Sequence, residues 1–474
     1  MEIENKKAVV VGCGKTGRST ATFLARRGAR VTVTDAAAAS VFKDAAPGLS
    51  NLGVALEFGG HRPETFAGAD MIIVSPGVSH TIAPIAAAQA AGTPVMGEIE
   101  LAFRFITAPI LAVTGTNGKS TVTLLAGEML KASGLKVFVG GNLGTPLIDS
   151  VEADTPPDRI VAEISSFQLD TIDSFRPAVA VLLNITDDHL DRYPDAEAYA
   201  RSKGKIFMNQ GPADTAVINM ADPVTRRIFD ERCADAVHEP PRRFIYGMDA
   251  DQEQPEGRKA DGRAWISGRE LWFETPEWGV FSVPRADIVL SGRHNLENIC
   301  AAGLAVLAAG GTPEGVTAAV RGFTGLPHRV QHVDTVNGVQ YIDDSKATNV
   351  DAAARALEAF DNPVVLIMGG RDKGGSYAPL KSRFAGRVRH LVVLGEAAAK
   401  IAAELKDAAP ITRAATMDAA VLAAGAVAVS GDTVLLSPAC SSFDMYESYA
   451  RRGEDFARAV REMREMQEIK RGAS

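Results

Sequence analysis

The sequence predicts an α/β protein made of three domains, each built around a largely parallel sheet. Short apolar runs that suit buried strands, such as residues 71–74 and 364–368, alternate along the chain with helical segments. Two such runs lead through glycine-rich turns into helices, which is the order of a nucleotide-binding βαβ unit. The length of 474 residues also exceeds what one hydrophobic core holds, which favours about three domains.

Composition and charge are those of an ordinary globular protein, with 46% hydrophobic and 23% charged residues. The net charge is -8 and no helix is rich in lysine and arginine, so we expect no nucleic-acid partner and no membrane partner. No apolar run approaches the ~20 residues that span a bilayer, and the first residues lack the apolar core of a signal peptide. The four cysteines are far apart and form no C-x-x-C pair, which favours reduced thiols and a cytoplasmic setting.

The first domain is expected over residues 1–97. A strand that begins at Lys7 leads into the turn 12–17, Gly-Cys-Gly-Lys-Thr-Gly, and a helix then precedes a second strand that ends at Asp35. A G-x-G-x-x-G turn between strand and helix, with an acid at the end of the next strand, is typical of dinucleotide sites. The turn offers a helix N-terminus to a diphosphate, and the acid can meet a ribose or sugar hydroxyl. By itself the turn leaves three interpretations open: NAD or FAD, another nucleotide, or a tight turn without a ligand.

The second domain is expected over residues 98–325 and begins with a phosphate-binding loop. Residues 113–121, Val-Thr-Gly-Thr-Asn-Gly-Lys-Ser-Thr, follow an apolar strand and open into a helix. Small residues let backbone N–H groups close on phosphate oxygens, Lys119 supplies a cation, and Ser120 can bind Mg²⁺. Val113 stands where the general G-x-x-x-x-G-K-[ST] pattern begins with glycine, so a turn without a ligand is the alternative. An oxidoreductase has no use for a triphosphate site, so this loop favours an enzyme that consumes ATP over one that uses NAD.

Two strand ends in the second domain carry side chains that suit a metal ion. Glu163 ends a predicted buried strand and could complete a Mg²⁺ shell with Ser120; a helix cap is the alternative. Residues 184–194 place His189 among acids and an arginine after the next strand, although a lone histidine is more often structural. Lys203 lies on a predicted helix, where most lysines are solvated.

The second half of this domain is expected to differ from the first in its secondary structure. Residues 197–209 are expected to form a helical stretch. Between residues 240 and 284, turn residues and short strand-like pieces replace the earlier alternation, which predicts a small antiparallel annex. A helix over residues 296–309 then leads to a linker at residues 325–327.

The third domain is expected over residues 326–474 and ends in a charged helix. Polar loops follow three of its predicted strands, at residues 343–349, 369–374 and 437–443. Loops at the carboxyl ends of parallel strands are where open α/β sheets bind ligands. A loop that mixes one cation with several hydrogen-bonding groups suits a carboxylate, although each loop alone could be a simple turn.

The motifs together resemble those of the Mur ligases, the ATP-dependent enzymes that form peptide bonds in bacterial cell-wall precursor synthesis. The resemblance runs from the first glycine loop to residues 437–443 (Ser-Pro-Ala-Cys-Ser-Ser-Phe), and includes residues 326–329 (Leu-Pro-His-Arg) and 344–349 (Asp-Ser-Lys-Ala-Thr-Asn). The family's own phosphate loop is Gly-Thr-Asn-Gly-Lys followed by Ser or Thr, which explains the valine at position 113. Within the family, these segments are most similar to those of the members that add D-glutamate to UDP-N-acetylmuramoyl-L-alanine.

The resemblance implies an N-terminal Rossmann-like domain that binds the UDP-substrate, a central P-loop ATPase domain with the annex, and a C-terminal Rossmann-like domain that binds glutamate and ATP. It implies ATP and Mg²⁺, the latter as two ions, as cofactors in place of NAD. The implied partners are the small molecules UDP-N-acetylmuramoyl-L-alanine and glutamate, and we expect the enzyme to be a monomer.

The resemblance also assigns roles to individual residues. It implies that Lys203 is carbamylated, which makes chemical sense because a free ammonium would repel Mg²⁺ whereas a carbamate supplies an anionic oxygen. Tyr449 stands where the family has an aromatic residue near the glutamate pocket. The implied catalytic residues are Lys119, Asn142, Glu163, His189 and Lys203, and the implied metal ligands are Ser120, Glu163, His189 and carbamylated Lys203. The residues implied to bind ATP are Gly115, Thr116, Asn117, Gly118, Lys119, Ser120, Thr121, Asn295, Asn298, Arg329 and Asp344. Those implied for the UDP-substrate are Gly14, Lys15, Thr16, Asp35, Gly77 and Asn142, and those for glutamate are Lys346, Thr348, Lys373, Ser442 and Phe443.

The implied reaction transfers the γ-phosphoryl group of ATP to the substrate carboxylate, after which the amino group of glutamate attacks the acyl phosphate. Because an acyl phosphate hydrolyses in an open cleft, we expect the third domain to close onto the second about residues 325–327. The alternatives within the ligases are a sibling Mur-type enzyme, a folylpolyglutamate-type enzyme and a variant that adds L-glutamate. Outside them, the alternatives are an NAD(P)-dependent oxidoreductase and a non-catalytic nucleotide-binding protein.

Overall fold

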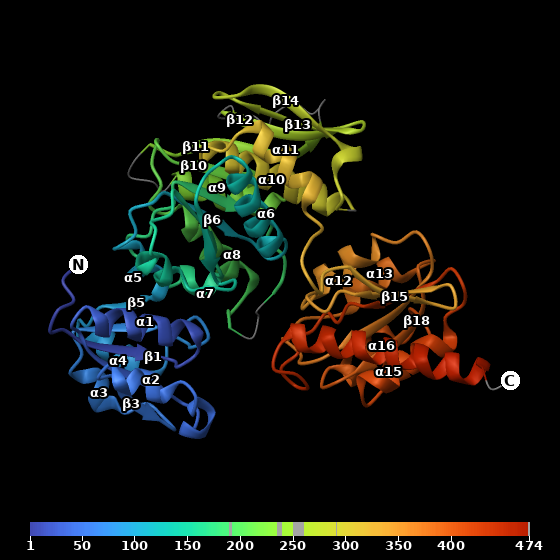
Figure 1. Cartoon of the computed structure of the whole chain (residues 1–474), viewed down its shortest axis with the longest axis horizontal. Coiled ribbons are helices and arrows are strands. Elements are labelled where there is room, and N and C mark those ends of the chain that lie inside the picture. The colour runs from blue at the N-terminus through green and yellow to red at the C-terminus, as the bar shows by residue number, and fades with distance from the viewer. Residues whose placement is uncertain (189–191, 235–238, 250–259, 291, 473–474) are drawn as a thin grey trace. The chain divides into compact units, whose positions relative to one another are not determined.

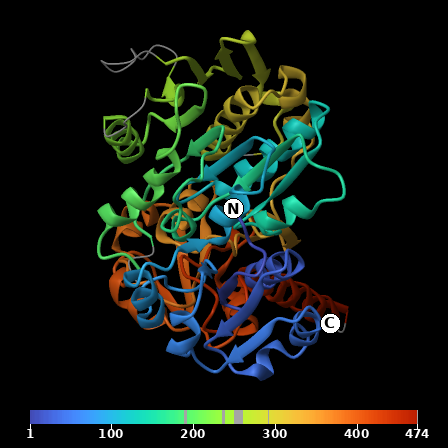
Figure 2. The same ribbon diagram turned by 90° about the vertical axis from the view of Figure 1, so that its left-hand side faces the viewer.

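The computed structural model describes residues 1–188, 192–234, 239–249, 260–290 and 292–472. The strands of these residues form three sheets, and helices connect the strands. The first sheet is drawn in blue, the second in cyan through green to yellow, and the third in orange to red in Figures 1 and 2. The backbone of the described residues divides into two compact units. Residues 1–185, 200–289 and 296–323 make up the first unit, and residues 186–199, 290–295 and 324–474 make up the second. The α/β class expected from the sequence is confirmed.

The first sheet has five parallel strands in the order β3-β2-β1-β4-β5. Strand β1 is buried from Ala8 onward, which explains its continuous apolar run. The chain leaves β1 toward β2 and later returns to β4 on the other side, so the ends of β1 and β4 border the crevice where such sheets bind ligands. The elements are β1 (Lys7–Val11), α1 (Lys15–Arg26), β2 (Arg30–Asp35), η1 (Ala39–Phe42), α2 (Ala46–Asn51), β3 (Ala55–Phe58), α3 (Pro63–Ala67), β4 (Met71–Val74), α4 (Ala83–Ala90) and β5 (Val95–Gly97).

The second sheet has nine strands in the order β14-β13-β12-β11-β10-β9-β6-β8-β7. Strand β6 is central and buried, with β8 and β9 parallel to it on either side. Loops that follow these three strands therefore emerge at one edge of the sheet. Its elements begin with α5 (Glu98–Phe103), β6 (Ile110–Thr114), α6 (Lys119–Ala132), β7 (Val137–Gly141), η2 (Leu147–Glu152), β8 (Arg159–Glu163), α7 (Ser166–Leu169), β9 (Val179–Leu182), α8 (Ala196–Gly204) and η3 (Lys205–Phe207). They continue with β10 (Thr215–Asn219), α9 (Pro223–Ala234), β11 (Arg242–Asp249), β12 (Gly262–Ser267), β13 (Glu270–Thr275), β14 (Gly279–Pro284), η4 (Arg285–Asp287), α10 (Arg293–Ala308) and α11 (Pro313–Gly322).

Two expectations for the second sheet need adjustment. The predicted antiparallel strands are present as β12, β13 and β14, but they continue the central sheet, because β12 pairs in parallel with β11. The helical stretch predicted over residues 197–209 is present as two consecutive pieces, since α8 ends at Gly204 and the 3-10 helix η3 follows directly and ends at Phe207. A Cβ at Gly204 would lie 2.5 Å from Cγ2 of Ile228, so glycine allows close packing against α9 where the helix ends.

The third sheet has six strands in the order β15-β16-β20-β17-β18-β19, parallel except for the β15–β16 hairpin. Alternate residues of β17 face two apolar clusters, with Leu366 in one and Val365 in the other, so both faces of the sheet are covered. Of the helices described, none combines the length and the apolar character that a membrane crossing needs. The elements are β15 (Gln331–Val336), β16 (Val339–Asp343), α12 (Val350–Leu357), β17 (Val364–Gly369), η5 (Ala378–Leu380), α13 (Lys381–Phe384), β18 (Val388–Leu394), α14 (Ala398–Leu405), β19 (Ile411–Arg413), α15 (Met417–Val427), β20 (Thr433–Leu436) and α16 (Tyr449–Gly472).

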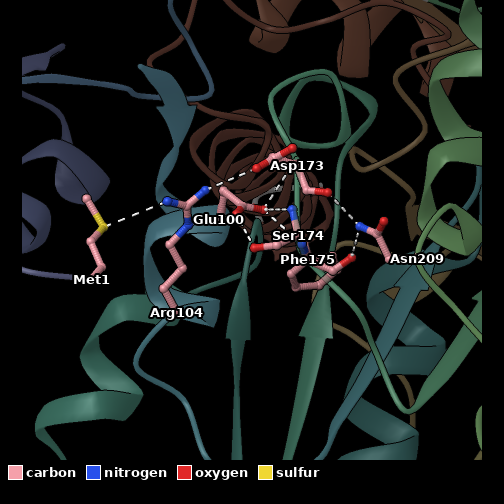
Figure 3. A network of polar contacts seen from close by, with 7 residues as sticks. All are labelled: Met1, Glu100, Arg104, Asp173, Ser174, Phe175 and Asn209. Carbon is pink, nitrogen blue, oxygen red and sulfur yellow. Dashed lines mark hydrogen bonds and ion pairs between the residues drawn. The ribbon is translucent and has the colours of Figure 1, made fainter. Parts of the chain in front are cut away.

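A buried carboxylate ties α5 to the loop before β9, as Figure 3 shows. Glu100 accepts hydrogen bonds from the backbone N–H groups of Asp173, Ser174 and Phe175 at 2.9 to 3.1 Å. The Ser174 hydroxyl and the Arg104 guanidinium donate to the same carboxylate at 2.6 and 2.9 Å. Burial alone would raise the pKa of Glu100, but these donors outweigh it and hold the pKa below its ordinary value. The carboxylate thus anchors the segment that connects the first sheet to the second.

Candidate functional site

The phosphate-binding loop joins β6 to α6, and its two glycines are required by its shape. Gly115 and Gly118 have φ of +146° and +88°, which L side chains rarely adopt. A Cβ at Gly118 would lie 2.5 Å from Oδ1 of Asn298, so the loop passes very close to α10. This contact brings together two regions that the resemblance assigns to ATP.

Asn184, which follows β9, holds the loop in place. Its carbonyl oxygen accepts from the Thr116 N–H, and its Oδ1 accepts from the Asn117 N–H, both at 2.8 Å. Its Nδ2 in turn donates to the Asn117 carbonyl at 3.0 Å. These two loop amides therefore have partners within the protein, and the loop is shaped before any phosphate arrives. We did not predict this role for Asn184, because it depends on the pairing of β6 with β9.

Two lysines converge on the loop. Lys119 donates to the carbonyl oxygens of Gly115 and Thr116 at 2.9 and 2.8 Å. Lys203 donates to the same Gly115 oxygen at 2.8 Å, and only 1% of it is exposed. The expectation from composition that Lys203 is solvated is therefore wrong, because the first helical turns of α6 and the end of α8 meet at this loop. Like charges brought this close favour the binding of an anion.

Glu163 offers an open ligand position for a cation at the same edge of the sheet. It pairs with Val113 in the register of β8 and β6, next to the loop. Its Oε1 accepts from Nδ2 of Asn142 at 2.8 Å, whereas its buried Oε2 has no hydrogen-bond partner among the residues described. A buried carboxylate oxygen without a donor costs stability, and a divalent cation relieves this cost. Ser120, at 5% exposure, is the second residue of α6, beside the loop.

The structure gives less information on the other predicted metal ligands than on Glu163. His189 lies outside the described residues, so its predicted role as a ligand stays a prediction. Within the described ranges, no three His, Cys, Asp or Glu side chains cluster in a way that could hold a metal ion. The donor set that fits Mg²⁺ therefore rests on the open oxygen of Glu163 and on Ser120, which lies on the helix that follows the neighbouring strand β6.

The first glycine loop has the shape expected of a diphosphate site. A Cβ at Gly17 would lie 1.8 Å from the Gly12 carbonyl oxygen, so only glycine fits there. Gly14 caps α1 without a side-chain hydrogen bond, and a Cβ at Gly14 or Gly77 would meet no described atom within 4 Å. The helix N-terminus is thus open to an anion.

Asp35 and Lys15 make contacts around this loop that the sequence did not predict. The carboxylate of Asp35 accepts from the N–H groups of Cys13 and Ala37 at 2.7 and 2.8 Å, so it shapes the loop. Lys15 reaches the second domain, where it donates to the Gly144 carbonyl oxygen at 2.7 Å. Gly144 follows Asn142 by two residues, which links the diphosphate loop to the residue beside Glu163. The side chain of Thr16 is half-buried at the start of α1.

The residues outside the loop that are predicted to bind the adenine, ribose and phosphates of ATP are divided between the two compact units. Asn298 belongs to the first, and Asn295, Arg329 and Asp344 belong to the second. Burial raises the pKa of Asp344 to about 7, although the charge of Arg329 and a hydrogen bond from Ser437 at 2.9 Å favour its ionised form. A carboxyl group poised in this way can accept from a ligand hydroxyl.

The third-sheet loops hold the residues predicted to bind glutamate. Lys346 donates to the Tyr449 hydroxyl at 3.1 Å, and its Nζ lies 4.3 Å from the centre of that ring. Thr348 and Lys373 line one pocket, to which Asp188 also contributes. Lys346, Ser442 and Phe443 do not line it, and they differ in exposure, since Ser442 is 2% and Phe443 62% exposed.

Arg452, near the start of α16, holds these loops together and was missed by sequence reasoning. Its guanidinium, in a side chain that is almost fully buried, donates to the carbonyl oxygens of Ser345, Gly369, Cys440 and Ser441 at 2.8 to 3.3 Å. Burial lowers the pKa of Arg452 to about 10, which still leaves it charged at neutral pH. The only sequence signal was an arginine at the start of a charged helix, which does not distinguish a buried side chain from a solvated one.

Three models of Mur ligase domains match the chain. The N-terminal domain of MurD-like Mur ligases matches residues 6–97, the Mur ligase middle domain residues 113–306, and the Mur ligase glutamate ligase domain residues 328–440. The UDP-N-acetylmuramoylalanine--D-glutamate ligase of Desulfosudis oleivorans is 49% identical over 98% of both chains. The enzyme of the same name from Geotalea daltonii is 46% identical over 97% of this chain and 98% of its own.

Solved structures agree on the fold. The UDP-N-acetylmuramate-alanine ligase of Thermotoga maritima matches with a TM-score of 0.57 at 19% identity, over 97% of this chain and all of its own. The pseudomurein peptide ligase type C of Methanothermus fervidus matches with a TM-score of 0.58 at 19% identity, over 91% of this chain and 96% of its own. The sequence matches and the two glycine loops, each between a strand and a helix, both indicate the same family. The chain therefore belongs to the Mur ligase family and is an ATP-dependent ligase.

Proposed function

We propose that this ligase joins D-glutamate to UDP-N-acetylmuramoyl-L-alanine in the synthesis of a peptidoglycan precursor, with release of ADP and phosphate. The observation that carries the proposal is the identity of 44–49% to enzymes named for this reaction, over 97–98% of the chain. The two anion sites described above support it, because a substrate that carries a nucleoside diphosphate and an ATP each require one.

The phosphoryl transfer is assigned to the loop that follows β6. Lys119 binds the phosphates of ATP, and the N-terminus of α6 faces them. Ser120, Glu163, His189 and carbamylated Lys203 would hold Mg²⁺, which would offset the charge of the transferred phosphoryl group. Asn142 holds Glu163 by the hydrogen bond to its Oε1 and is also assigned to the UDP-substrate. The family's chemistry calls for two ions, and we propose both here.

The remaining residues position the substrates. Gly14, Lys15, Thr16, Asp35 and Gly77 form the site for the UDP-substrate at the end of the first sheet. Asn295 and Asn298 face the adenine of ATP, and Arg329 and Asp344 bind its ribose and phosphates. Lys346, Thr348, Lys373, Ser442 and Phe443 surround glutamate, whose amino group attacks the acyl phosphate and expels phosphate. We place the domain boundaries after residues 97 and 325, and we propose a cytoplasmic monomer.

Related ligases are the second candidates, but no observation favours them. The folylpolyglutamate-type enzyme is represented by Escherichia coli FolC, which matches with a TM-score of 0.55 at 18% identity and therefore shows only a common fold. The enzymes of 46–49% identity are named for D-glutamate, which favours this enantiomer over L-glutamate.

The proposal is tested by ADP release from the purified chain with Mg²⁺, ATP, UDP-N-acetylmuramoyl-L-alanine and one amino acid at a time. We expect release with D-glutamate, and little with L-glutamate or when either substrate is omitted. Equal release without the UDP-substrate, or a preference for another amino acid, would overturn the proposed substrates.

A further inference from the structure

The side chains of Lys373 and Asn349 bind the carboxylate of Asp188. Nζ of Lys373 lies 3.1 Å from Oδ1 of Asp188, and Nδ2 of Asn349 donates to Oδ2 at 3.1 Å. All three residues belong to the second compact unit, and the side chain of Asp188 is only 7% exposed. Each oxygen of one carboxylate is thus bound by a different donor from the third-sheet loops.

The amide of Asn349 is oriented by the backbone rather than by Asp188. Asn349 is the N-cap of α12, and its Oδ1 accepts from the Ala352 N–H at 2.8 Å. Because this cap fixes the side-chain oxygen, the nitrogen of the amide must point the other way, toward the pocket. The donor would therefore stay in place if another carboxylate took the position of Asp188.

The neighbouring acid Asp372 has other partners. Its carboxylate accepts from Nζ of Lys400 at 2.8 Å and from the Tyr377 hydroxyl at 3.1 Å. Burial would raise its pKa, but the hydrogen bonds from Lys400 and Tyr377 outweigh this effect and keep the pKa below its ordinary value. Asp372 is thus held as an anion beside Lys400, and the ion pair that the structure shows for Lys373 is with Asp188.

Lys373 is already assigned to the incoming glutamate; we propose that Asp188 occupies the carboxylate position between Lys373 and Asn349 until a carboxylate of the amino acid displaces it. The proposal rests on the proposed function, which supplies an amino acid with free carboxylates. Thr348, Tyr377 and Asp188 line the same pocket, which places the ion pair at its wall. A substrate carboxylate would meet the same amine and amide, so the exchange preserves both charge-assisted hydrogen bonds.

An internal carboxylate that competes for the site weakens glutamate binding, so its removal should strengthen binding. In the full-length enzyme, with ATP, Mg²⁺ and UDP-substrate saturating, Asp188→Asn should lower the KM for D-glutamate about threefold to tenfold, which is the range of a partly buried ion pair. Asp407→Asn removes an equal charge from an exposed position of the same unit and should leave this KM within about twofold.

A second variant tests the site without touching Asp188. Asn349→Ser keeps a side-chain oxygen that caps α12 but removes the amide donor, so it should raise the KM for D-glutamate about threefold to tenfold while the melting temperature stays nearly unchanged. An unchanged or higher KM in Asp188→Asn, or an unchanged KM in Asn349→Ser, overturns the inference while wild-type ligation of glutamate persists. If the wild-type enzyme does not ligate glutamate, the proposed function itself is wrong and this inference falls with it.

Discussion

Lys119 and Lys203 donate to one acceptor, the carbonyl oxygen of Gly115, at 2.9 and 2.8 Å. The first lysine opens α6 and the second lies near the end of α8, so the sheet brings two distant cations to one loop. Mutual repulsion makes this pair unfavourable unless an anion binds nearby or one charge is removed. The proposed function includes both: the phosphates of ATP bind beside the two lysines, and a carbamate replaces the charge of Lys203.

Replacing Lys119 should strongly slow phosphoryl transfer without affecting the UDP site. Lys119→Ala removes the mobile cation of the loop, so kcat for ADP release should fall about 10²-fold to 10³-fold. Binding of the UDP-substrate, measured by calorimetry, should be unchanged because the first glycine loop is a separate site. Lys131→Ala, which breaks an exposed ion pair with Glu128 on the same helix, is the control and should retain full activity. An equal loss in both variants would contradict the assignment.

Lys203 is predicted to carry a carbamate formed from carbon dioxide. Enzyme equilibrated with ¹³C-bicarbonate should show a carbamate signal in its ¹³C NMR spectrum, and Lys203→Arg should lack it. Arginine keeps the positive charge but does not form this carbamate, so activity should fall at least about 10²-fold. If the arginine variant stays active, or if the wild-type enzyme shows no signal, the carbamate has no part in the reaction.

The open oxygen of Glu163 predicts a specific dependence on Mg²⁺. Glu163→Gln keeps an oxygen that can accept from Asn142 but loses the charge, so the Mg²⁺ concentration for half-maximal activity should rise about tenfold or more. Saturating Mg²⁺ should recover part of the lost rate. A variant with lower activity but an unchanged Mg²⁺ requirement would show that Glu163 acts in another way.

Glu98 predicts how stability changes with pH. Its Oε1 accepts from the Ile148 N–H at 2.6 Å, and its Oε2 is buried without a hydrogen-bond partner in the described part of the chain. Burial raises its pKa from 4.5 to about 7, so the folded state holds a proton that the unfolded state releases. The stability from this proton is complete below pH 4.5 and is lost as the pH rises to about 7, by up to about 3 kcal/mol.

Denaturant unfolding of the wild-type protein and of Glu98→Gln at pH 5 and pH 8 measures this effect. Glutamine does not ionise, so the free energy of unfolding of the variant should change less between the two pH values than that of the wild-type protein. Equal changes would mean that Glu98 does not titrate in this range.

The motifs that could be predicted best from the sequence are those whose shape depends on residues adjacent in the chain. The two glycine loops were predicted with their flanking strands and helices, because close approach and left-handed φ at Gly115 and Gly118 require glycine at fixed spacing. A strand that ends in a buried carboxylate indicated a cation at Glu163; the structure adds that one oxygen of this carboxylate has no hydrogen-bond partner among the described residues, and the metal role stays a prediction.

Residues that act across the sheet could not be predicted in the same way. Lys203 looked like a solvated helix residue, yet it is buried against a carbonyl 88 positions earlier in the chain. Arg452 and Asn184 hold loops that come from other strands, and no local pattern records such pairings. Asp35 was expected to meet a sugar hydroxyl, and the structure adds that its carboxylate also shapes the first glycine loop.

The most direct test of the central claim follows an oxygen atom through the reaction. UDP-N-acetylmuramoyl-L-alanine labelled with ¹⁸O in its carboxylate is incubated with the enzyme, ATP, Mg²⁺ and D-glutamate, and the phosphate released is analysed by mass spectrometry. A carboxylate oxygen that attacks the γ-phosphorus leaves with phosphate when the amino group displaces it, so each phosphate should carry one ¹⁸O atom, in step with formation of the amide. Unlabelled phosphate, or labelled phosphate without amide, would contradict the account.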